Sequence, residues 1–221
     1  MKDNKILSRK EKEIENRKKY IIDTAERLFK SKGFDNTTMD EIAAESEFSK
    51  GTLYKYFNSK DDLYIAIGIK AYELIIKYTK DFTEKENPGI KQLMAVGYAY
   101  YEFSKKNPSY TSIFHDIAMK FPEIVTKSED ERSEIEQEYF NISQLYGSLF
   151  IKILQDAMKA KAIRSDKNPN MIGFVLSRAT RVMVEELVQN ESIITKFKLK
   201  KDEIINFFFE ILGEGLKPRD K

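Results

Sequence analysis

Apolar residues recur three or four positions apart along nearly the whole chain, and alternating strand patterns are hard to find. The first helix predicted by this spacing runs from about Ser8 to Lys32. Gly33 follows it as a predicted left-handed cap. The second helix begins at Thr38, where Glu41 completes a capping box.

A turn over residues 46–48 separates the second helix from a short third one, capped by Ser49 and holding residues 51–57. Ser59 and Asp62 then start a fourth helix that runs to about Asp81. After "TEKENPG" the pattern predicts longer helices near residues 90–106, 109–118, 128–161, 169–190 and 201–216. The predicted fold class is therefore all-α.

Two short helices joined by a tight turn, behind a longer helix, describe a helix-turn-helix, whose second short helix enters the DNA major groove. Gly51 opens that helix in this chain. Glycine costs a helix about 1 kcal/mol relative to alanine, so its presence needs a reason. A helix start without a side chain can approach DNA closely, which is the reason we infer.

The side chains around Gly51 suit a DNA contact because they supply hydroxyl and ammonium donors for phosphates and base edges. We expect Lys50 and Thr52 to read bases, while Thr38, Tyr56 and Lys60 fix the register through phosphates. Leu53 and Phe57 are better explained as core. The predicted DNA-binding residues are Thr37, Thr38, Ser49, Lys50, Gly51, Thr52, Tyr54, Lys55, Tyr56 and Lys60.

The stretch "GFDNTTMDEIAAESEFSKGTLYKYFNSKDDLY" strongly resembles the N-terminal DNA-binding domain of TetR-family transcriptional regulators. The likeness is specific from about Tyr20 to Leu63, and only length and helical character extend it further. The residues that carry it are Gly33, Phe34, Thr37, Thr38, Ile42, Ala43, Ser49, Gly51, Leu53, Tyr54, Tyr56, Phe57, Lys60 and Leu63.

The resemblance implies a homodimer that binds a palindromic DNA operator, with a small-molecule pocket in the C-terminal domain and release of DNA when the ligand binds. We expect a three-helix DNA-binding domain over residues 1–62, its first 15 residues a frayed extension. A larger helical ligand-binding and dimerisation domain is expected over residues 63–221. The fourth helix would link the two and transmit ligand binding.

One position departs from the family pattern. The turn before the third helix commonly carries glycine, whereas here it carries Glu47. If the turn requires a left-handed residue, Glu47 costs about 1–2 kcal/mol there.

Composition narrows the function further. The chain has 221 residues, a net charge of +2, no cysteine and one histidine. No signal peptide or bilayer-length apolar run is evident, so we expect a cytoplasmic protein without a membrane partner. With no cysteine, one histidine and no phosphate-loop or dinucleotide motif, we expect neither an enzyme nor a metal site, and no cofactor.

The second half of the chain is rich in aromatic residues, which at helical spacing are usually core. We nevertheless expect a pocket for a small apolar or aromatic effector there. The candidate lining residues are Tyr98, Phe114, His115, Tyr146, Phe150 and Phe174. For His115, a surface or structural role is the alternative.

The last two helices, 169–190 and 201–216, carry more apolar surface than one monomer face needs. We expect them to pair with their copies as a four-helix bundle. The alternative is that this surface packs inside the monomer. The sequence as a whole predicts a ligand-responsive regulator, most simply a repressor. Its alternatives are a helical carrier protein that never touches DNA, and a helical enzyme.

Overall fold

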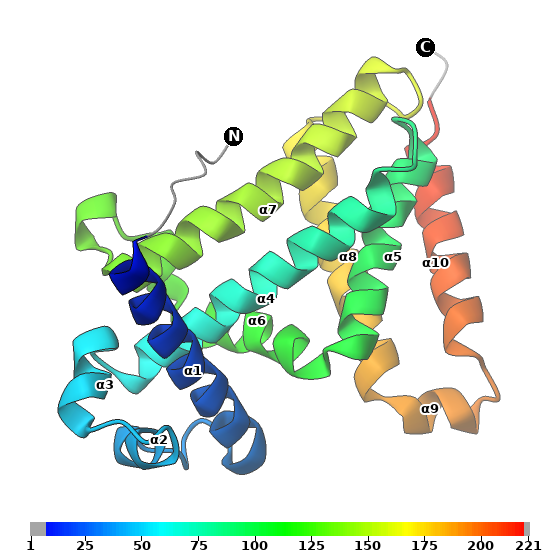
Figure 1. The fold of residues 1–221 in the computed structure, drawn as a ribbon. Coiled ribbons are helices and arrows are strands. Elements are labelled where there is room, and N and C mark those ends of the chain that lie inside the picture. Colours follow the sequence, from blue (N-terminus) through cyan, green and yellow to red (C-terminus); the bar gives the residue numbers. More distant parts are fainter. Residues whose placement is uncertain (1–7, 219–221) are drawn as a thin grey trace. The chain divides into compact units, whose positions relative to one another are not determined.

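A computed structural model describes residues 8–218, without the side chains of residues 191–193. Figure 1 follows its helices along the chain. The α-helices are α1 (Arg9–Lys32), α2 (Met39–Glu45), α3 (Lys50–Tyr56), α4 (Lys60–Thr83), α5 (Ile90–Lys106), α6 (Pro108–Lys120), α7 (Glu134–Lys159), α8 (Pro169–Gln189), α9 (Glu191–Lys196) and α10 (Lys201–Leu216). Two 3₁₀ turns, η1 (Pro122–Val125) and η2 (Glu129–Glu131), lie between α6 and α7.

The all-α prediction is confirmed, since residues 8–218 contain helices, turns and loops but no strand. No helix in this part of the chain has the length and apolarity needed to cross a bilayer. Most helix boundaries fall within one or two residues of their predicted positions. The predicted helix over residues 128–161 is wrong at its start, because a 3₁₀ turn precedes α7. The helix α9 was not predicted.

Gly33 departs in part from its predicted conformation. Its φ of 83° is positive, but its ψ of 157° lies far from the left-handed helical region. This extended conformation is open essentially to glycine alone. Its amide still donates to the Phe29 carbonyl oxygen at 2.9 Å, so Gly33 ends α1 while turning the chain toward α2.

The chain divides into two compact units. The first unit comprises the described residues up to Ile69 together with Ile117–Tyr139, and the second comprises Lys70–Asp116 and the described residues from Phe140 onward. The boundary predicted after residue 62 falls inside α4. Residues 117–139, assigned from the sequence to the second domain, cluster with the first unit.

Gly68 on α4 is one reason for that clustering. A Cβ at this position would overlap the side chain of Ile117 and lie 2.9 Å from the ring of Tyr139. Only a residue without a side chain lets these two residues approach the α4 backbone so closely. The later segment therefore becomes part of the first unit's core.

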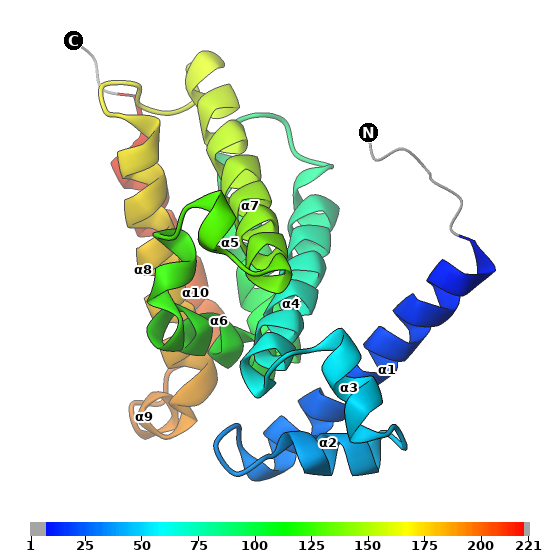
Figure 2. The ribbon, with the colours of Figure 1, turned by 90° about the vertical axis from the view of Figure 1, so that its left-hand side faces the viewer.

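The helix-turn-helix is held by a small apolar core in the first unit. Ile21 and Ala25 of α1, Ile42 of α2 and Leu53 of α3 are fully buried. Figure 2 shows the short helices α2 and α3 joined by their tight turn, with α1 packed against α2. Each of the two short helices buries one face in this core, and its opposite face is exposed to solvent.

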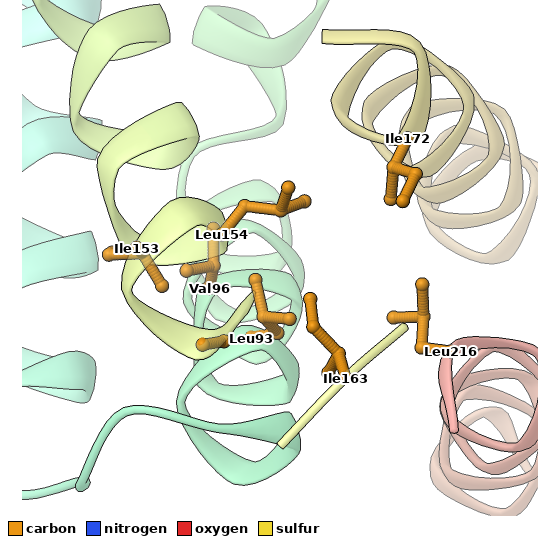
Figure 3. Close-up of a cluster of buried hydrophobic side chains, with 8 residues drawn as sticks. Leu93, Val96, Ile153, Leu154, Ile163, Ile172 and Leu216 are labelled. Carbon is orange, nitrogen blue, oxygen red and sulfur yellow. The ribbon is translucent and has the colours of Figure 1, made fainter. Parts of the chain in front are cut away.

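The second unit has a core built mainly by α5, α8 and α10, which pack pairwise. Figure 3 shows one cluster of this core, where side chains from α5, α7, α8 and α10 converge. Gly173 of α8 also packs within this unit. A Cβ there would lie 2.7 Å from Ile151 of α7.

Candidate functional site

The turn between α2 and α3 is a Schellman motif. The Phe48 amide donates to the Ala43 carbonyl oxygen and the Glu47 amide to the Ala44 carbonyl oxygen, each at 3.1 Å. This pattern requires a left-handed residue at Glu47, whose φ is 58°. The sequence raised a left-handed conformation at this position as a condition, and the structure meets it.

The predicted capping box is present at the N-terminus of α2. The Glu41 amide donates to the Thr38 hydroxyl at 3.2 Å, and the Thr38 amide donates to the Glu41 carboxylate at 2.9 Å. Lys32 donates to the same carboxylate at 2.8 Å. The Lys32 ammonium and the Thr38 amide hold the pKa of Glu41 down to about 2. Thr38 itself remains exposed.

The start of α3 presents polar side chains to solvent. Ser49 caps the helix, accepting from the Thr52 amide at 3.1 Å, and its hydroxyl lies 2.8 Å from the Thr52 hydroxyl. Lys50 forms an exposed ion pair with Asp40 of α2 at 2.7 Å. The hydrogen bond to that carboxylate raises the pKa of Lys50. Asp40 therefore competes with any other anion for the Lys50 ammonium.

Gly51 has no neighbour that would exclude a side chain. A Cβ placed there meets no other group within 4 Å, and the residue lies inside α3. Neither crowding within the described residues nor the backbone conformation therefore explains why this position lacks a side chain.

Further along α3, Tyr54 and Lys55 are exposed, Tyr54 by 42%. Tyr56 is half-buried beside Arg17 of α1. The Glu13 carboxylate and then the Tyr56 hydroxyl raise the pKa of Arg17. The exposed surface of α3 therefore continues onto α1 through an arginine that the predicted site did not include.

Lys60 has a structural role within the first unit. Its ammonium donates to the Phe34 carbonyl oxygen at 2.7 Å and lies 4.4 Å from the centre of the Phe34 ring. Lys120 lies 4.3 Å from the same ring and 3.8 Å from the Asp35 carboxylate. Two lysines far apart in sequence thus meet at one phenylalanine, a contact that no local pattern signals.

Thr37 is placed differently from the other predicted DNA-binding residues. It is fully buried, and its hydroxyl donates to the Gly33 carbonyl oxygen at 2.8 Å. Its side chain closes the loop between α1 and α2 and is withheld from solvent. The remaining predicted residues lie on α3 or at the starts of α2 and α4.

The predicted ligand-binding residues of the second unit fall into two groups. Phe114 and Tyr146 come together through Tyr72, whose ring centre lies 4.6 Å from that of Phe114 and 5.9 Å from that of Tyr146. Phe150 packs beside the cluster of Figure 3.

The other three predicted residues lie elsewhere. His115 is exposed, and Phe174 is 63% exposed on α8. Tyr98 donates to the Asn206 side-chain oxygen at 2.6 Å and packs on Phe209 of α10. Sequence spacing placed these residues on the right helices, but it did not determine which face of each helix is covered.

The described residues contain no group of three or more histidine or acidic side chains arranged to hold a metal ion.

Residues 21–67 match the family model described as "Bacterial regulatory proteins, tetR family". A nucleoid occlusion factor, SlmA of Haemophilus ducreyi, is 25% identical over 154 residues, covering 68% of this chain and 70% of that protein. The uncharacterised HTH-type regulator YuxN of Bacillus subtilis is 40% identical over 70 residues, covering 32% of this chain and 22% of that protein.

Solved structures share the fold. The transcriptional regulator FadR of Bacillus subtilis, in complex with stearoyl-CoA, superimposes with a TM-score of 0.64 at 17% identity, covering 90% of this chain and 98% of that one. The ketosteroid regulator KstR2 of Mycobacterium tuberculosis also superimposes with a TM-score of 0.64, at 15% identity, covering 92% of this chain and 96% of that one.

Proposed function

Because this chain belongs to the tetR family of bacterial regulatory proteins through its helix-turn-helix, we propose that it is a ligand-responsive transcriptional repressor. It binds a palindromic operator as a homodimer and leaves it when a small apolar or aromatic effector binds. The observation that carries this proposal is the exposed polar face of α3 around Gly51, which nothing in the described chain covers.

The proposed DNA contacts follow from that face. Ser49, Lys50 and Thr52 lie at the start of α3 and are exposed or half-exposed, so they suit base edges and phosphates. Tyr54 and Lys55 suit the flanking phosphates. Lys50 would exchange Asp40 for DNA, which makes its contribution smaller than that of an unpaired lysine.

Register would be fixed by groups at the edges of the motif. Thr38 and Tyr56 present hydroxyls there, and Arg17 adds a guanidinium beside Tyr56. Lys60 would contribute mainly by holding the loop at Phe34 in place, because its ammonium is already committed to that carbonyl oxygen.

The homodimer is proposed to form through α8 and α10. Large apolar side chains are exposed on both helices, between 50% and 63% of each. They are Met171, Phe174, Val175, Val182, Phe207 and Ile211. Apolar faces of this extent mark contact surfaces, and pairing with a second copy would cover them as a four-helix bundle.

The effector is proposed to bind in the second unit. FadR, which has a similar fold, was solved in complex with stearoyl-CoA, a ligand with a long apolar chain. In this chain the aromatic contacts from Tyr72 to Phe114 and Tyr146 supply the corresponding apolar surroundings.

A second candidate is suggested by SlmA, the nucleoid occlusion factor, whose similarity spans 68% of this chain. In that case the protein would act on the nucleoid as a whole and not at single promoters. Both candidate functions use the same DNA-binding face, and they differ in which sites on the chromosome that face binds.

The test is binding of the full-length protein to duplexes from the region flanking its own gene, at two salt concentrations. We expect a sequence-specific complex with two subunits, weakened by salt as phosphate contacts release counterions. Lys55→Ala should weaken all sequences alike and lower the salt slope by about one. Lys152→Ala, an exposed lysine of α7, is the matched control and should change neither.

Chromosome-wide mapping of the bound sites separates the two candidates. One or a few sites at promoters would support the repressor, whereas many sites away from promoters would support the nucleoid factor. No binding even at low salt would overturn both and favour the carrier protein.

A further inference from the structure

The proposed dimer surface carries two charged side chains among its apolar ones. Arg178 of α8 and Glu210 of α10 are both exposed. Arg178 lies one helical turn from Phe174 and from Val182, which are 63% and 59% exposed, and Glu210 is next to Ile211, which is 54% exposed. A second copy that covered the apolar side chains would also take both charges out of water. Burying a charge is costly unless an opposite charge meets it, so each of the two needs a partner.

The other charged side chains of α8 and α10 have partners within the described residues. The ion pairs are Arg181–Glu185 at 3.2 Å, Glu203–Lys200 at 2.8 Å and Glu214–Lys217 at 2.7 Å, while Asp202 accepts from Tyr101, Glu186 accepts from Asn190, and Lys201 is also engaged.

Arg178 and Glu210 differ from that set. Between residues 8 and 218, neither side chain forms an ion pair or a hydrogen bond, apart from any contact to the undescribed side chains of residues 191–193. The Arg178 guanidinium lies 5.4 Å from the centre of the exposed Phe174 ring, which does not neutralise its charge. The surface therefore leaves one positive and one negative charge unmatched.

The helices α8 and α10 run antiparallel to each other within the second unit. Ile172, near the start of α8, belongs to the same buried cluster as Leu216 at the end of α10, as Figure 3 shows. Val184, further along α8, belongs to a second cluster together with Ile205, near the start of α10. These two clusters fix which level of α8 lies beside which level of α10.

The two unmatched charges lie at the same level of this helix pair. Arg178 stands halfway between the two α8 positions just named, and Glu210 stands about halfway between the two α10 positions. In a four-helix bundle whose twofold axis runs along the helices, each level of one copy faces the same level of the other. Arg178 of one copy then faces Glu210 of the partner subunit, and the symmetry repeats the contact.

We propose that Arg178 forms an ion pair with Glu210 of the partner subunit, twice in each dimer, and that these pairs make the surface of α8 and α10 selective for a second copy of this chain. The inference rests on the proposed homodimer and names the side chains that select its partner. An apolar surface alone accepts many partners, whereas an unmatched charge excludes chains that lack the opposite group. A guanidinium and a carboxylate also fit each other through paired hydrogen bonds.

The experiment uses two charge reversals in the full-length protein. Arg178→Glu gives a chain with two acidic groups at the contact, and Glu210→Arg gives a chain with two basic groups. Each variant alone should dimerise about a hundredfold more weakly than wild type in analytical ultracentrifugation, because like charges then meet twice. Both positions are exposed, so each monomer should keep the helix content of wild type in circular dichroism.

Mixing the two variants in equal amounts separates a contact between chains from one within a chain. In the mixed dimer every acidic group faces a basic one, so dimers with one chain of each kind should form within about tenfold of the wild-type affinity. Native mass spectrometry identifies them by mass. A chain that carries both reversals should also dimerise. Lys152→Glu, a charge reversal at an exposed position of α7, is the matched control and should dimerise like wild type.

A single reversal that dimerises as tightly as wild type would overturn the proposed pair. A mixture that stays monomeric would overturn it as well, and so would a monomeric chain with both reversals. Wild-type protein that is monomeric at every concentration tested would overturn the homodimer and the pair together. Operator binding of wild type is measured in parallel. Recovery of dimers in the mixture without any DNA binding would support the pair and count against the regulator alone.

Discussion

At the scale of single residues, two positions carry a residue type that their backbone conformation does not favour. Backbone preference alone would favour glycine at position 47 and a residue with a side chain at position 51. The chain has Glu47 and Gly51 instead. Glutamate takes the left-handed turn position with a φ of 58°, and glycine takes a helical position with open space around it. Each mismatch leads to a prediction.

Replacing Glu47 by glycine should stabilise the protein. The left-handed conformation costs a non-glycine residue about 1–2 kcal/mol, and glycine's greater freedom in the unfolded chain offsets part of the gain. We expect a net gain of about 1 kcal/mol in unfolding free energy, seen as a rise in melting temperature. Lys198, at the same position of a second Schellman motif with a φ of 53°, should respond in the same way.

The control for Glu47→Gly is Ala44→Gly, at an exposed position inside α2. There glycine should cost about 1 kcal/mol, because the backbone is helical. A lower or unchanged melting temperature for Glu47→Gly would contradict the idea that the turn is strained.

Gly51→Ala should stabilise the free protein but weaken operator binding. The helix gains about 1 kcal/mol, since nothing within 4 Å meets the new methyl group. On DNA, the same methyl group would enter the space that the α3 start needs for close approach. Calorimetric melting and operator titration measure the two effects separately.

Gly147→Ala supplies the matched control, because it also lies in a helix with open space around it. It should raise stability to a similar extent and leave operator affinity unchanged. Unaltered DNA affinity in Gly51→Ala would remove the functional explanation for this glycine.

At the scale of elements, the short helices α2 and α3 depend on their ends. With seven residues each, neither is long enough to be stable alone, so caps and burial determine whether they form. The α2 capping box couples Thr38, Glu41 and Lys32 at the point where the chain leaves α1. Glu41 must be ionised to pair with Lys32, which makes this element sensitive to acid.

The sign of this pH dependence follows from the pKa of Glu41, which falls from 4.5 to about 2 on folding. Its stabilising contribution is complete above pH 4.5 and is lost as the pH falls toward 2. Glu41→Gln keeps a capping side chain but loses the charge. The variant should melt below wild type at pH 7, and the difference should shrink steadily from pH 5 to pH 2.5. A difference that stays constant over that range would show that the carboxylate's charge does not matter.

At the scale of the whole molecule, the proposed homodimer would cover the exposed apolar side chains of α8 and α10. A helix-turn-helix reads a palindrome only as a pair, with recognition helices about 34–36 Å apart. The proposed dimer therefore links the second unit's surface to DNA binding by the first unit.

Phe207→Glu places a charge in the middle of the proposed interface, at a side chain that is 62% exposed. We expect the dimer to dissociate at micromolar concentration and operator affinity to fall by more than tenfold, because burying an unpaired charge is costly. Sedimentation and operator titration measure these effects. Val125→Glu, equally exposed on η1, is the control and should leave the molecular mass unchanged. A dimer that survives Phe207→Glu would place the interface elsewhere.

The amino-acid sequence by itself determined the helical class, most helix boundaries, the α2 capping box and the strained turn at Glu47. All of these depend on residues close together in the chain, where spacing, caps and backbone preference act directly. It also placed the third helix of the candidate DNA interface within one residue of α3, because a cap and local spacing define so short a helix.

Only the tertiary structure decided which faces are covered. It buried Thr37, exposed His115 and Phe174, and brought Lys60 and Lys120 to the same phenylalanine. It also joined residues 117–139 to the first unit. These outcomes depend on contacts between residues far apart in sequence, and helical spacing specifies a buried face without specifying what packs against it.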